Sequence, residues 1–242
     1  MAVTTRVTVS GTPIMLHLPS WHAKDAAGLR AVIAVHGHGG HEYQIQQGGQ
    51  SPFAGHPEYL ADHGYAVACG YTGDQWLNPA SMTVLTTVYN YLVTTLGANG
   101  PKVGLFGWSM GGGNALRWAA ENPTKVAAGY LCSPLTDLDW AHAQAAWTAE
   151  IDTAYSNNYT VNGSPRSPVT NAATYRGGAR FLIGHATNDA TVPYTQTTAF
   201  ITAVNDSAVT LRQPDILGDH QGGLTQVPPR ETWEWLRTQW AA

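Results

Sequence analysis

Apolar residues in this chain gather into short runs that are separated by longer segments of mixed polarity. Continuous apolar runs at residues 29–35, 65–69, 102–106, 127–132 and 180–184 have the length and composition of buried parallel strands. Strands that alternate with helical segments indicate a mostly parallel sheet that helices cover on both faces. We therefore predict an α/β fold with a mostly parallel central sheet.

The segments between these runs have the patterns of helices, turns and further strands. We predict helices at residues 57–63, 79–96, 112–121 and 193–204, a last parallel strand at 208–213, and an opening antiparallel pair of strands at 3–9 and 13–18. The chain of 242 residues has the length of one α/β domain, so a single domain over residues 1–242 is expected.

One connection between strands is much longer than a usual crossover. It spans residues 135–178 and begins with a segment, residues 137–155, that predicts a helix bearing Trp140 and Trp147. Its second half is polar and rich in turn-forming residues. We expect a cap or lid insertion, the alternative being an amphipathic helix that packs on the sheet edge.

A Gly-Trp-Ser-Met-Gly pentapeptide spans residues 107–111, between a predicted strand and a predicted helix. A serine at such a sharp turn is a nucleophile elbow, and Ser109 is the candidate nucleophile. Glycines at positions 107 and 111 remove the Cβ atoms that the strained turn cannot accommodate. The turn also directs the first free N–H groups of the helix toward the reaction centre, where negative charge develops.

A second glycine-rich turn, His-Gly-His-Gly-Gly-His at residues 36–41, follows the first of the parallel strands. We expect the backbone N–H groups of His38 and Met110 to form an oxyanion hole, with Gly37 or Gly39 as alternatives to His38. The donors in such a site are backbone N–H groups, and glycines without side chains let the substrate come close to them.

Three histidines within this turn also raise the question of a metal site. The spacing of His36, His38 and His41 fits no strong zinc pattern, and Glu42 is the only carboxylate close by in the sequence. We therefore expect no metal, and we expect these histidines to orient the turn.

The acid and base candidates lie downstream. Asp189 follows the strand at residues 180–184 within a G-x-x-x-x-D-x-x-V-P segment, and His220 lies in the loop after the last predicted strand. The chain order Ser109, Asp189, His220 is that of α/β hydrolases. His220 would take the serine proton and return it to the leaving group, and Asp189 would hold the other ring nitrogen.

Other residues compete for these roles. Asp137 and Asp139 follow the fourth parallel strand, a position where a catalytic acid also occurs, and they are the alternatives to Asp189. Asp219 is adjacent to the candidate base and is expected to point elsewhere. His185 lies near Asp189 in sequence, but at a strand end, where a structural hydrogen bond is expected.

Composition narrows the classes of function. Charged residues make up 12% of the chain and the net charge is −4, without a basic stripe or block, so binding to nucleic acid is not expected. No apolar run approaches the ~20 residues that span a bilayer. The N-terminus lacks the pattern of a signal peptide, which is compatible with a cytoplasmic or a phage- or virion-associated protein. The oligomeric state is not indicated.

The two cysteines, Cys69 and Cys132, fall in strands that the usual order of such a sheet separates by two others. Three strand spacings place them about 14 Å apart. This exceeds the ~7 Å limit for a disulfide, so two free, buried thiols are predicted.

Over nearly its whole length the chain resembles serine hydrolases of the α/β-hydrolase superfamily. Residues 107–113 are similar to the elbow of cutinase-like polyester hydrolases, although those enzymes usually lack a long cap, carry an aromatic residue where this chain has His38, and often place a cysteine near the catalytic histidine. The long insertion and the acid loop are instead similar to esterases and peptidases related to dienelactone hydrolase and prolyl oligopeptidase.

These observations predict a carboxylic ester hydrolase that acts through an acyl-enzyme on a small-molecule or polymeric ester. No cofactor is implied. Trp76, Trp140 and Trp147 are the candidate substrate-binding residues. A serine peptidase or amidase would use the same catalytic residues and is the first alternative. A non-catalytic binding module is the second, although such modules typically lose one of the three catalytic residues.

Overall fold

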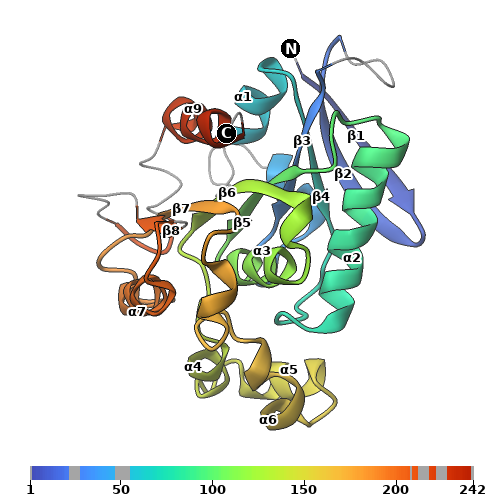
Figure 1. Cartoon of the computed structure of the whole chain (residues 1–242). Helices are drawn as coiled ribbons and strands as arrows, with labels where there is room; N and C mark the ends of the chain where they lie inside the picture. The colour runs from blue at the N-terminus through green and yellow to red at the C-terminus, as the bar shows by residue number, and fades with distance from the viewer. Residues whose placement is uncertain are drawn as a thin grey trace.

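The computed structural model describes residues 2–21, 28–46, 55–207, 209–211, 218–221 and 228–240. Its centre is one eight-stranded sheet in the order β1-β2-β4-β3-β5-β6-β7-β8 (Figure 1). The strands are β1 Ala2–Val9, β2 Thr12–Pro19, β3 Arg30–Val35, β4 Tyr65–Gly70, β5 Val103–Trp108, β6 Val126–Cys132, β7 Arg180–Gly184 and β8 Val209–Leu211. The β1–β2 and β2–β4 pairs are antiparallel and every other pair is parallel, which confirms the predicted class.

Helices cover both faces of this sheet, as Figure 1 shows. The α-helices are α1 His56–Asp62, α2 Pro79–Asn90, α3 Met110–Glu121, α4 Leu138–His142, α5 Thr148–Ala154, α6 Tyr159–Asn162, α7 Tyr194–Val204 and α9 Pro229–Trp240. Shorter turns of 3-10 helix are η1 Glu42–Gln46, η3 Pro123–Lys125, η4 Ser164–Arg166 and η5 Ala172–Tyr175, and η2 Tyr91–Thr95 is a π-helical turn.

Two apolar cores lie on opposite faces of the sheet because side chains alternate along each strand. In β3, Ile33 and Val35 belong to the core beneath α2, α3 and α7, whereas Val32 and Ala34 belong to the core beneath α1 and α9. The continuous apolar run of β3 therefore serves both faces, as expected of a central parallel strand.

Two helix predictions differ from the structure. The helix predicted at residues 79–96 changes to a π-helical turn after Asn90. The single helix predicted at 137–155 is wrong, since α4 ends at His142 and α5 begins at Thr148. The Thr148 hydroxyl donates to the His142 carbonyl oxygen at 2.8 Å, and Nε2 of His142 lies 2.8 Å from Oδ1 of Asp152. These contacts fold α5 back beside α4.

Residues 135–178, which we call the insertion, gather α4, α5 and α6 at one end of the molecule, below α3 in Figure 1. The insertion shares a third apolar core with the main body. Leu138 and Ile151 from the insertion pack there with Trp76, Leu77 and Met110 from the body. The insertion is thus packed onto the loop after β4 and the start of α3.

The order of the strands settles the spacing of the cysteines. Cys69 lies in β4 and Cys132 in β6, and β3 and β5 stand between them as predicted. Both thiols are free and buried, and burial raises the pKa of each well above its ordinary value.

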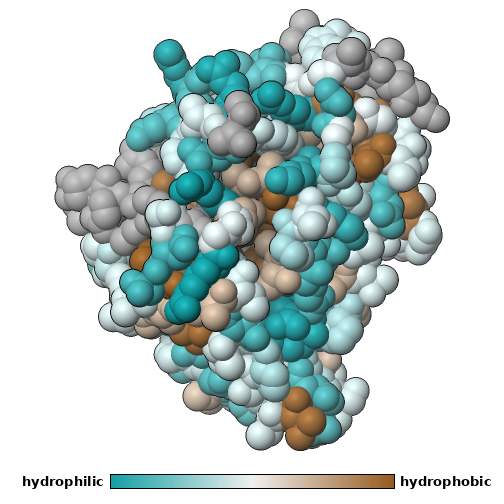
Figure 2. All heavy atoms as spheres, viewed as in Figure 1, coloured by the Kyte–Doolittle hydropathy of each residue, from teal (hydrophilic) through white to brown (hydrophobic). Residues whose placement is uncertain are grey.

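The length and hydropathy of the helices bear on whether any could span a membrane. Among the residues described above, none of the helices combines the length and the apolar character needed to cross a bilayer. On the face drawn in Figure 2, apolar residues are scattered singly or in small groups among hydrophilic ones.

Candidate active site

Ser109 lies at the junction between β5 and α3, in a backbone conformation that non-glycine residues rarely adopt. Its φ is 56° and its ψ is −125°, a conformation that costs of order 1–3 kcal/mol and persists only where the surroundings enforce it. Two hydrogen bonds do so: the Ser109 N–H donates to the Cys132 carbonyl oxygen at 3.0 Å, and the Leu135 N–H donates to the Ser109 carbonyl oxygen at 2.9 Å.

The glycines on both sides of Ser109 are required by packing of the backbone. A Cβ atom on Gly107 would lie 2.7 Å from the carbonyl oxygen of Gly111. A Cβ atom on Gly111 would collide with the carbonyl oxygens of Val35 and His36 at the end of β3. The tight turn therefore brings the start of α3 directly against the loop that follows β3.

Asp189 lies in the loop after β7, with its side chain fully buried. Its Oδ1 accepts hydrogen bonds from the N–H groups of Thr191 at 2.8 Å and Val192 at 3.0 Å. Its Oδ2 lies 2.6 Å from Nδ1 of His220. The structure thus brings together the predicted acid and base, which stand 31 positions apart in the chain.

A second histidine contacts the same carboxylate. Nε2 of His185 lies 3.2 Å from Oδ2 of Asp189 and 2.8 Å from the carbonyl oxygen of Val192, while Nδ1 lies 2.8 Å from the hydroxyl of Thr197. Because two oxygen acceptors face Nε2, that nitrogen carries a proton. From the sequence we predicted only a structural hydrogen bond for His185, although its position four residues before Asp189, at the end of a strand, was a signal for a contact with that carboxylate.

The electrostatic result is a carboxylate held in its charged form. Burial on its own raises the pKa of Asp189, but the hydrogen bonds from His185 and His220, followed by the charge of His220 and the Val192 N–H, outweigh it. The pKa of Asp189 is consequently far below its ordinary value.

His220 presents its other ring nitrogen without a partner. Nε2 is buried and makes no hydrogen bond within the described part of the chain, so it is not bonded to the Ser109 hydroxyl. The loop is fixed beside the elbow by Trp108, whose Nε1 donates to the His220 carbonyl oxygen at 3.2 Å and whose ring centroid lies 5.4 Å from the imidazole. The structure therefore forms the hydrogen bond between Asp189 and His220 but not one between Ser109 and Nε2 of His220.

Backbone donors in the loop after β3 distinguish the oxyanion candidates. The Gly37 N–H donates to Oε1 of Gln44 at 3.1 Å, and the Gly39 N–H donates to Oδ1 of Asp74 at 2.8 Å. No hydrogen bond involves the N–H of His38 or of Met110 among the described residues. Of the four N–H groups that the sequence offered, those of His38 and Met110 are thus without a partner among the described residues, and those of Gly37 and Gly39 are occupied.

His36 holds this loop in place from beneath. Its Nε2 accepts the Thr72 N–H at 3.0 Å, so its Nδ1 carries the proton and donates to the Gly37 carbonyl oxygen at 2.8 Å. The side chain is buried, and this burial lowers the pKa of His36. Across the described residues, no group of three histidine, cysteine or acidic side chains is arranged to hold a metal ion.

The alternative acids are committed elsewhere. Asp137 accepts the Trp140 N–H at 3.1 Å and caps α4, and Asp139 accepts the hydroxyl of Tyr159 at 2.7 Å. Asp219 is exposed, and its Oδ1 accepts the Gln221 N–H at 2.9 Å. Of these carboxylates, Asp189 alone has a described contact with the imidazole of His220.

A small cavity of about 10 Å³ lies beside Ser109. Its lining consists of His38, Trp76, Ser109, Met110, Leu135, Trp147 and Val192. Two of the three tryptophans that the sequence singled out thus reach the candidate nucleophile. Trp140 does not line this cavity, but packs edge-on against Trp147 with ring centroids 5.7 Å apart.

A family model for the prolyl oligopeptidase family matches residues 79–220, which is more than half of the chain and includes Ser109, Asp189 and His220. The chain belongs to the prolyl oligopeptidase family. It is accordingly a serine hydrolase with the α/β-hydrolase fold. No curated protein matches the sequence at a significant level.

Members and neighbours of this fold with solved structures differ greatly in length. Fluorophosphonate-binding serine hydrolase F (FphF) of Staphylococcus aureus has a TM-score of 0.76 and 16% identity, and the match covers 99% of this chain and 98% of that one. Est1E from Butyrivibrio proteoclasticus has a TM-score of 0.71 and 18% identity, with 99% of both chains covered.

The match to a Bacteroides ovatus protein described as a dipeptidyl aminopeptidase IV has a TM-score of 0.70 and 16% identity. It covers 98% of this chain but only 36% of that chain. The chain therefore spans about a third of the length of this relative. The TM-scores establish a shared fold, but at identities this low they do not indicate the substrate. Evidence on ester or peptide substrates must therefore come from the residues of the site.

Proposed function

We propose that this protein hydrolyses carboxylic esters, small or polymeric, through an acyl-enzyme on Ser109. The observation that carries the proposal is the hydrogen bond of 2.6 Å between Asp189 and His220, which leaves the buried Nε2 of His220 without a partner beside the elbow. A base with one nitrogen fixed by a carboxylate and the other free is equipped to take a serine proton.

The reaction follows from these positions. His220 removes the hydroxyl proton as Ser109 attacks the ester carbonyl carbon, and the carbonyl π electrons move onto oxygen. The free N–H groups of His38 and Met110 stabilise that oxyanion. When the carbon–oxygen bond of the ester breaks, the imidazolium gives its proton to the leaving alcohol, and a water then releases the acid by the same route. No cofactor takes part in this scheme.

The lining of the cavity beside Ser109 supports an ester rather than a peptide. Apart from Ser109 and His38, the lining side chains are apolar or tryptophan. The Nε2 atom of His38 is already paired with Oε2 of Glu150 at 2.7 Å. A peptidyl acyl group would bury amide groups in this cavity, at a cost of roughly 1–3 kcal/mol for each that lacks a partner.

Peptide or amide hydrolysis is the second candidate, and one feature of the site favours it. Nε1 of Trp76 is buried and has no acceptor among the described residues. An amide carbonyl could accept from it. The family also includes peptidases by name.

Matched substrates decide between these candidates. We expect turnover of p-nitrophenyl acetate by the wild-type protein, slower turnover of p-nitroacetanilide, and a loss of roughly 1,000-fold or more in kcat for Ser109→Ala. The Asp139→Asn variant, which changes a carboxylate with other partners, serves as the control. Faster cleavage of the anilide would favour the amidase.

Reaction with an organophosphate separates a hydrolase from a non-catalytic binding module. Diethyl p-nitrophenyl phosphate should phosphorylate Ser109 with release of one equivalent of nitrophenol, and mass spectrometry should place the adduct on that residue. A protein that neither reacts with this reagent nor turns over any ester would show that the machinery does not operate.

A further inference from the structure

We propose that the substrates are esters of short acyl groups, formyl or acetyl, with leaving groups that are not restricted in size. This inference rests on the proposed ester hydrolysis and adds the substrate class. The cavity beside Ser109 supplies the argument, together with the way in which the insertion is fastened over it.

The chemistry of proton transfer identifies which side of the site holds the acyl group. The leaving oxygen must receive a proton from Nε2 of His220, so the leaving group lies on the His220 side. The small cavity is lined by Ser109 and by the two residues with free N–H groups, but not by His220. It is therefore the acyl side.

The described residues on the His220 side form a larger groove. A groove of about 490 Å³ lies along His220, and Trp108, Asn188, Thr191 and Asp219 are among the residues that line it. Ser109 is not part of its lining. The groove is polar at several points and is large enough for a bulky alcohol.

The acyl cavity has room for a group about the size of one water molecule. Its volume is about 10 Å³, whereas a cavity needs ~10–15 Å³ measured in this way to hold a single water. A methyl group is of similar size, and each further methylene would have to displace a wall. The inner wall is buried, with Trp76, Met110 and Leu135 each 1% exposed.

The insertion holds Trp76 rigidly in place. Trp76 and Leu77 both have positive φ, 45° and 66°, a conformation that persists only where the surroundings enforce it. The Tyr155 hydroxyl donates to the Trp76 carbonyl oxygen at 2.7 Å, and Nδ2 of Asn78 donates to the Ala154 carbonyl oxygen at 2.9 Å.

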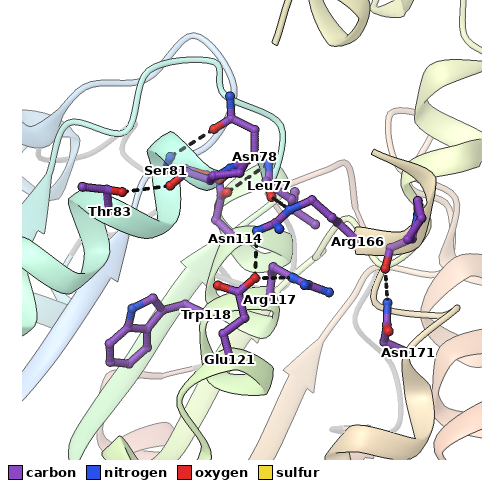
Figure 3. A network of polar contacts seen from close by, with 12 residues as sticks. Leu77, Asn78, Ser81, Thr83, Asn114, Arg117, Trp118, Glu121, Arg166 and Asn171 are labelled. Carbon is purple, nitrogen blue, oxygen red and sulfur yellow. Dashed lines mark hydrogen bonds and ion pairs between the residues drawn. The ribbon is translucent and has the colours of Figure 1, made fainter. Parts of the chain in front are cut away.

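Arg166 makes the second fastening, which Figure 3 shows between α3 and the loop after β4. Its Nε donates to the Leu77 carbonyl oxygen at 2.6 Å, and its guanidinium also pairs with Glu121 at 2.8 Å, where Arg117 binds the same carboxylate oxygen. From the other side, Asn114 accepts the Leu77 N–H at 3.1 Å. The insertion is thus tied to two elements of the main body.

The outer wall of the cavity is formed by Trp147 and His38, which contact Trp76 and a residue of the insertion. The ring of Trp147 lies 5.5 Å from that of Trp76, and the imidazole of His38 lies 5.1 Å from Trp76, measured between ring centroids. Glu150, one turn after Trp147, pairs with Nε2 of His38 at 2.7 Å. An acyl chain that outgrew the cavity would have to break this contact or move an anchored tryptophan.

A series of p-nitrophenyl esters tests the inference, since only the acyl chain changes. We expect kcat/KM to fall at least ~10-fold from acetate to butyrate and again to hexanoate. In Trp147→Ala the preference should move to butyrate or hexanoate, and Trp147→Phe should give a smaller shift in the same direction. Trp21→Ala removes an exposed tryptophan, 52% exposed and far from these walls in sequence, and should keep the wild-type profile.

A change of leaving group completes the experiment. Replacing p-nitrophenol with the larger 4-methylumbelliferone in the acetate ester should alter kcat/KM by no more than a few-fold. Wild-type turnover that is highest for hexanoate or octanoate would overturn the acyl limit while leaving ester hydrolysis intact. Absence of turnover for every ester, together with an unreactive Ser109, would instead remove the proposed function. A Trp147→Phe variant with a native circular dichroism spectrum and an unchanged acyl profile would show that the insertion does not set the limit.

Discussion

Nε2 of His185 lies 3.2 Å from Oδ2 of Asp189, on the oxygen that Nδ1 of His220 also approaches, at 2.6 Å. Counting the N–H groups of Thr191 and Val192 on Oδ1, the carboxylate has four donors around it. Such a carboxylate stays ionised and gains little from taking another proton. In the proposed reaction, the proton that His220 receives from the serine therefore stays on the imidazole until it passes to the leaving group.

Removal of the His185 imidazole should impair turnover. His185→Phe places a slightly larger aromatic ring at this position, and Asp189 and the Val192 carbonyl oxygen lose a donor while the Thr197 hydroxyl loses its partner. We expect kcat to fall roughly 10-fold or more because the carboxylate is less firmly held, with little change in KM. Stopped-flow and steady-state assays with p-nitrophenyl acetate measure both constants.

Thr197→Val provides the matched control for this prediction. It removes the hydroxyl that contacts Nδ1 of His185 and leaves the donor to Asp189 in place. Its effect on kcat should be clearly smaller than that of His185→Phe. Equal losses in the two variants, each with equal loss of thermal stability, would indicate packing rather than support of the carboxylate.

The central strands could be predicted from sequence because burial on both faces demands continuous apolar runs, as in β3 and β5. The elbow was predictable for a similar reason, since the clash of a Cβ atom on Gly111 with Val35 and His36 makes glycine obligatory there. Constraints of this kind act on single positions and restrict the residue types that can occur there, so they can be recognised in the sequence.

Apart from the pairing of Asp189 with His220, which the motif order and the family resemblance indicated, contacts between separated segments could not be predicted. The break between α4 and α5 accompanies the contact of His142 with Asp152, which a helical pattern does not reveal. The N–H groups of Gly37 and Gly39 are occupied by acceptors on Gln44 and Asp74, which leaves the N–H of His38 as the candidate donor. Such acceptors come from other segments and are known only once the chain has folded.

Gly111→Ala should disrupt the elbow more than the same substitution at Gly107, because its added Cβ atom makes the closer backbone contacts. The added Cβ meets two backbone carbonyl oxygens, and backbone cannot move aside as the end of a flexible side chain can. We expect a loss of more than ~2 kcal/mol in the free energy of unfolding and a corresponding loss of soluble, active protein. Urea unfolding followed by tryptophan fluorescence measures it.

Gly177→Ala is a useful comparison, because Gly177 has a φ of 64° but nothing within 4 Å of an added Cβ atom. Its cost is limited to backbone strain, of order 1–2 kcal/mol. If Gly111→Ala were as stable as Gly177→Ala, the close approach of α3 to the end of β3 would be incorrect.

Cys69 and Cys132 should be unreactive in the native protein. Both thiols are buried, and burial raises the pKa of each, so almost no thiolate is present at neutral pH. Ellman's reagent should label neither thiol in native buffer and both in guanidinium chloride, without reductant in either case. Rapid labelling of one thiol in the native state would show that its strand opens on the timescale of the reaction.

Acid should destabilise the protein through His36, and the sign follows from its lowered pKa. Burial lowers the pKa of His36 in the folded chain, whereas in the unfolded chain a histidine titrates near ~6.5. Below that pH the unfolded chain binds more protons, so stability is greatest above about pH 6.5 and declines as the pH falls. Urea midpoints between pH 5 and 8 should therefore decrease toward pH 5.

Protonation of His36 also weakens the loop that carries the proposed oxyanion donor. A protonated His36 can no longer accept the Thr72 N–H, which lies 3.0 Å from its Nε2. Burial also lowers the pKa of His17, which adds a contribution of the same sign, so His36→Phe should flatten the pH dependence only in part. The low pKa of Asp189 keeps that carboxylate ionised throughout this range. An identical dependence of the urea midpoint on pH between pH 5 and 7 in wild type and His36→Phe would contradict this prediction. It would mean that His36 takes up protons in the folded state as readily as in the unfolded chain. The loop after β3 would then be held by its other contacts, such as those with Gln44 and Asp74.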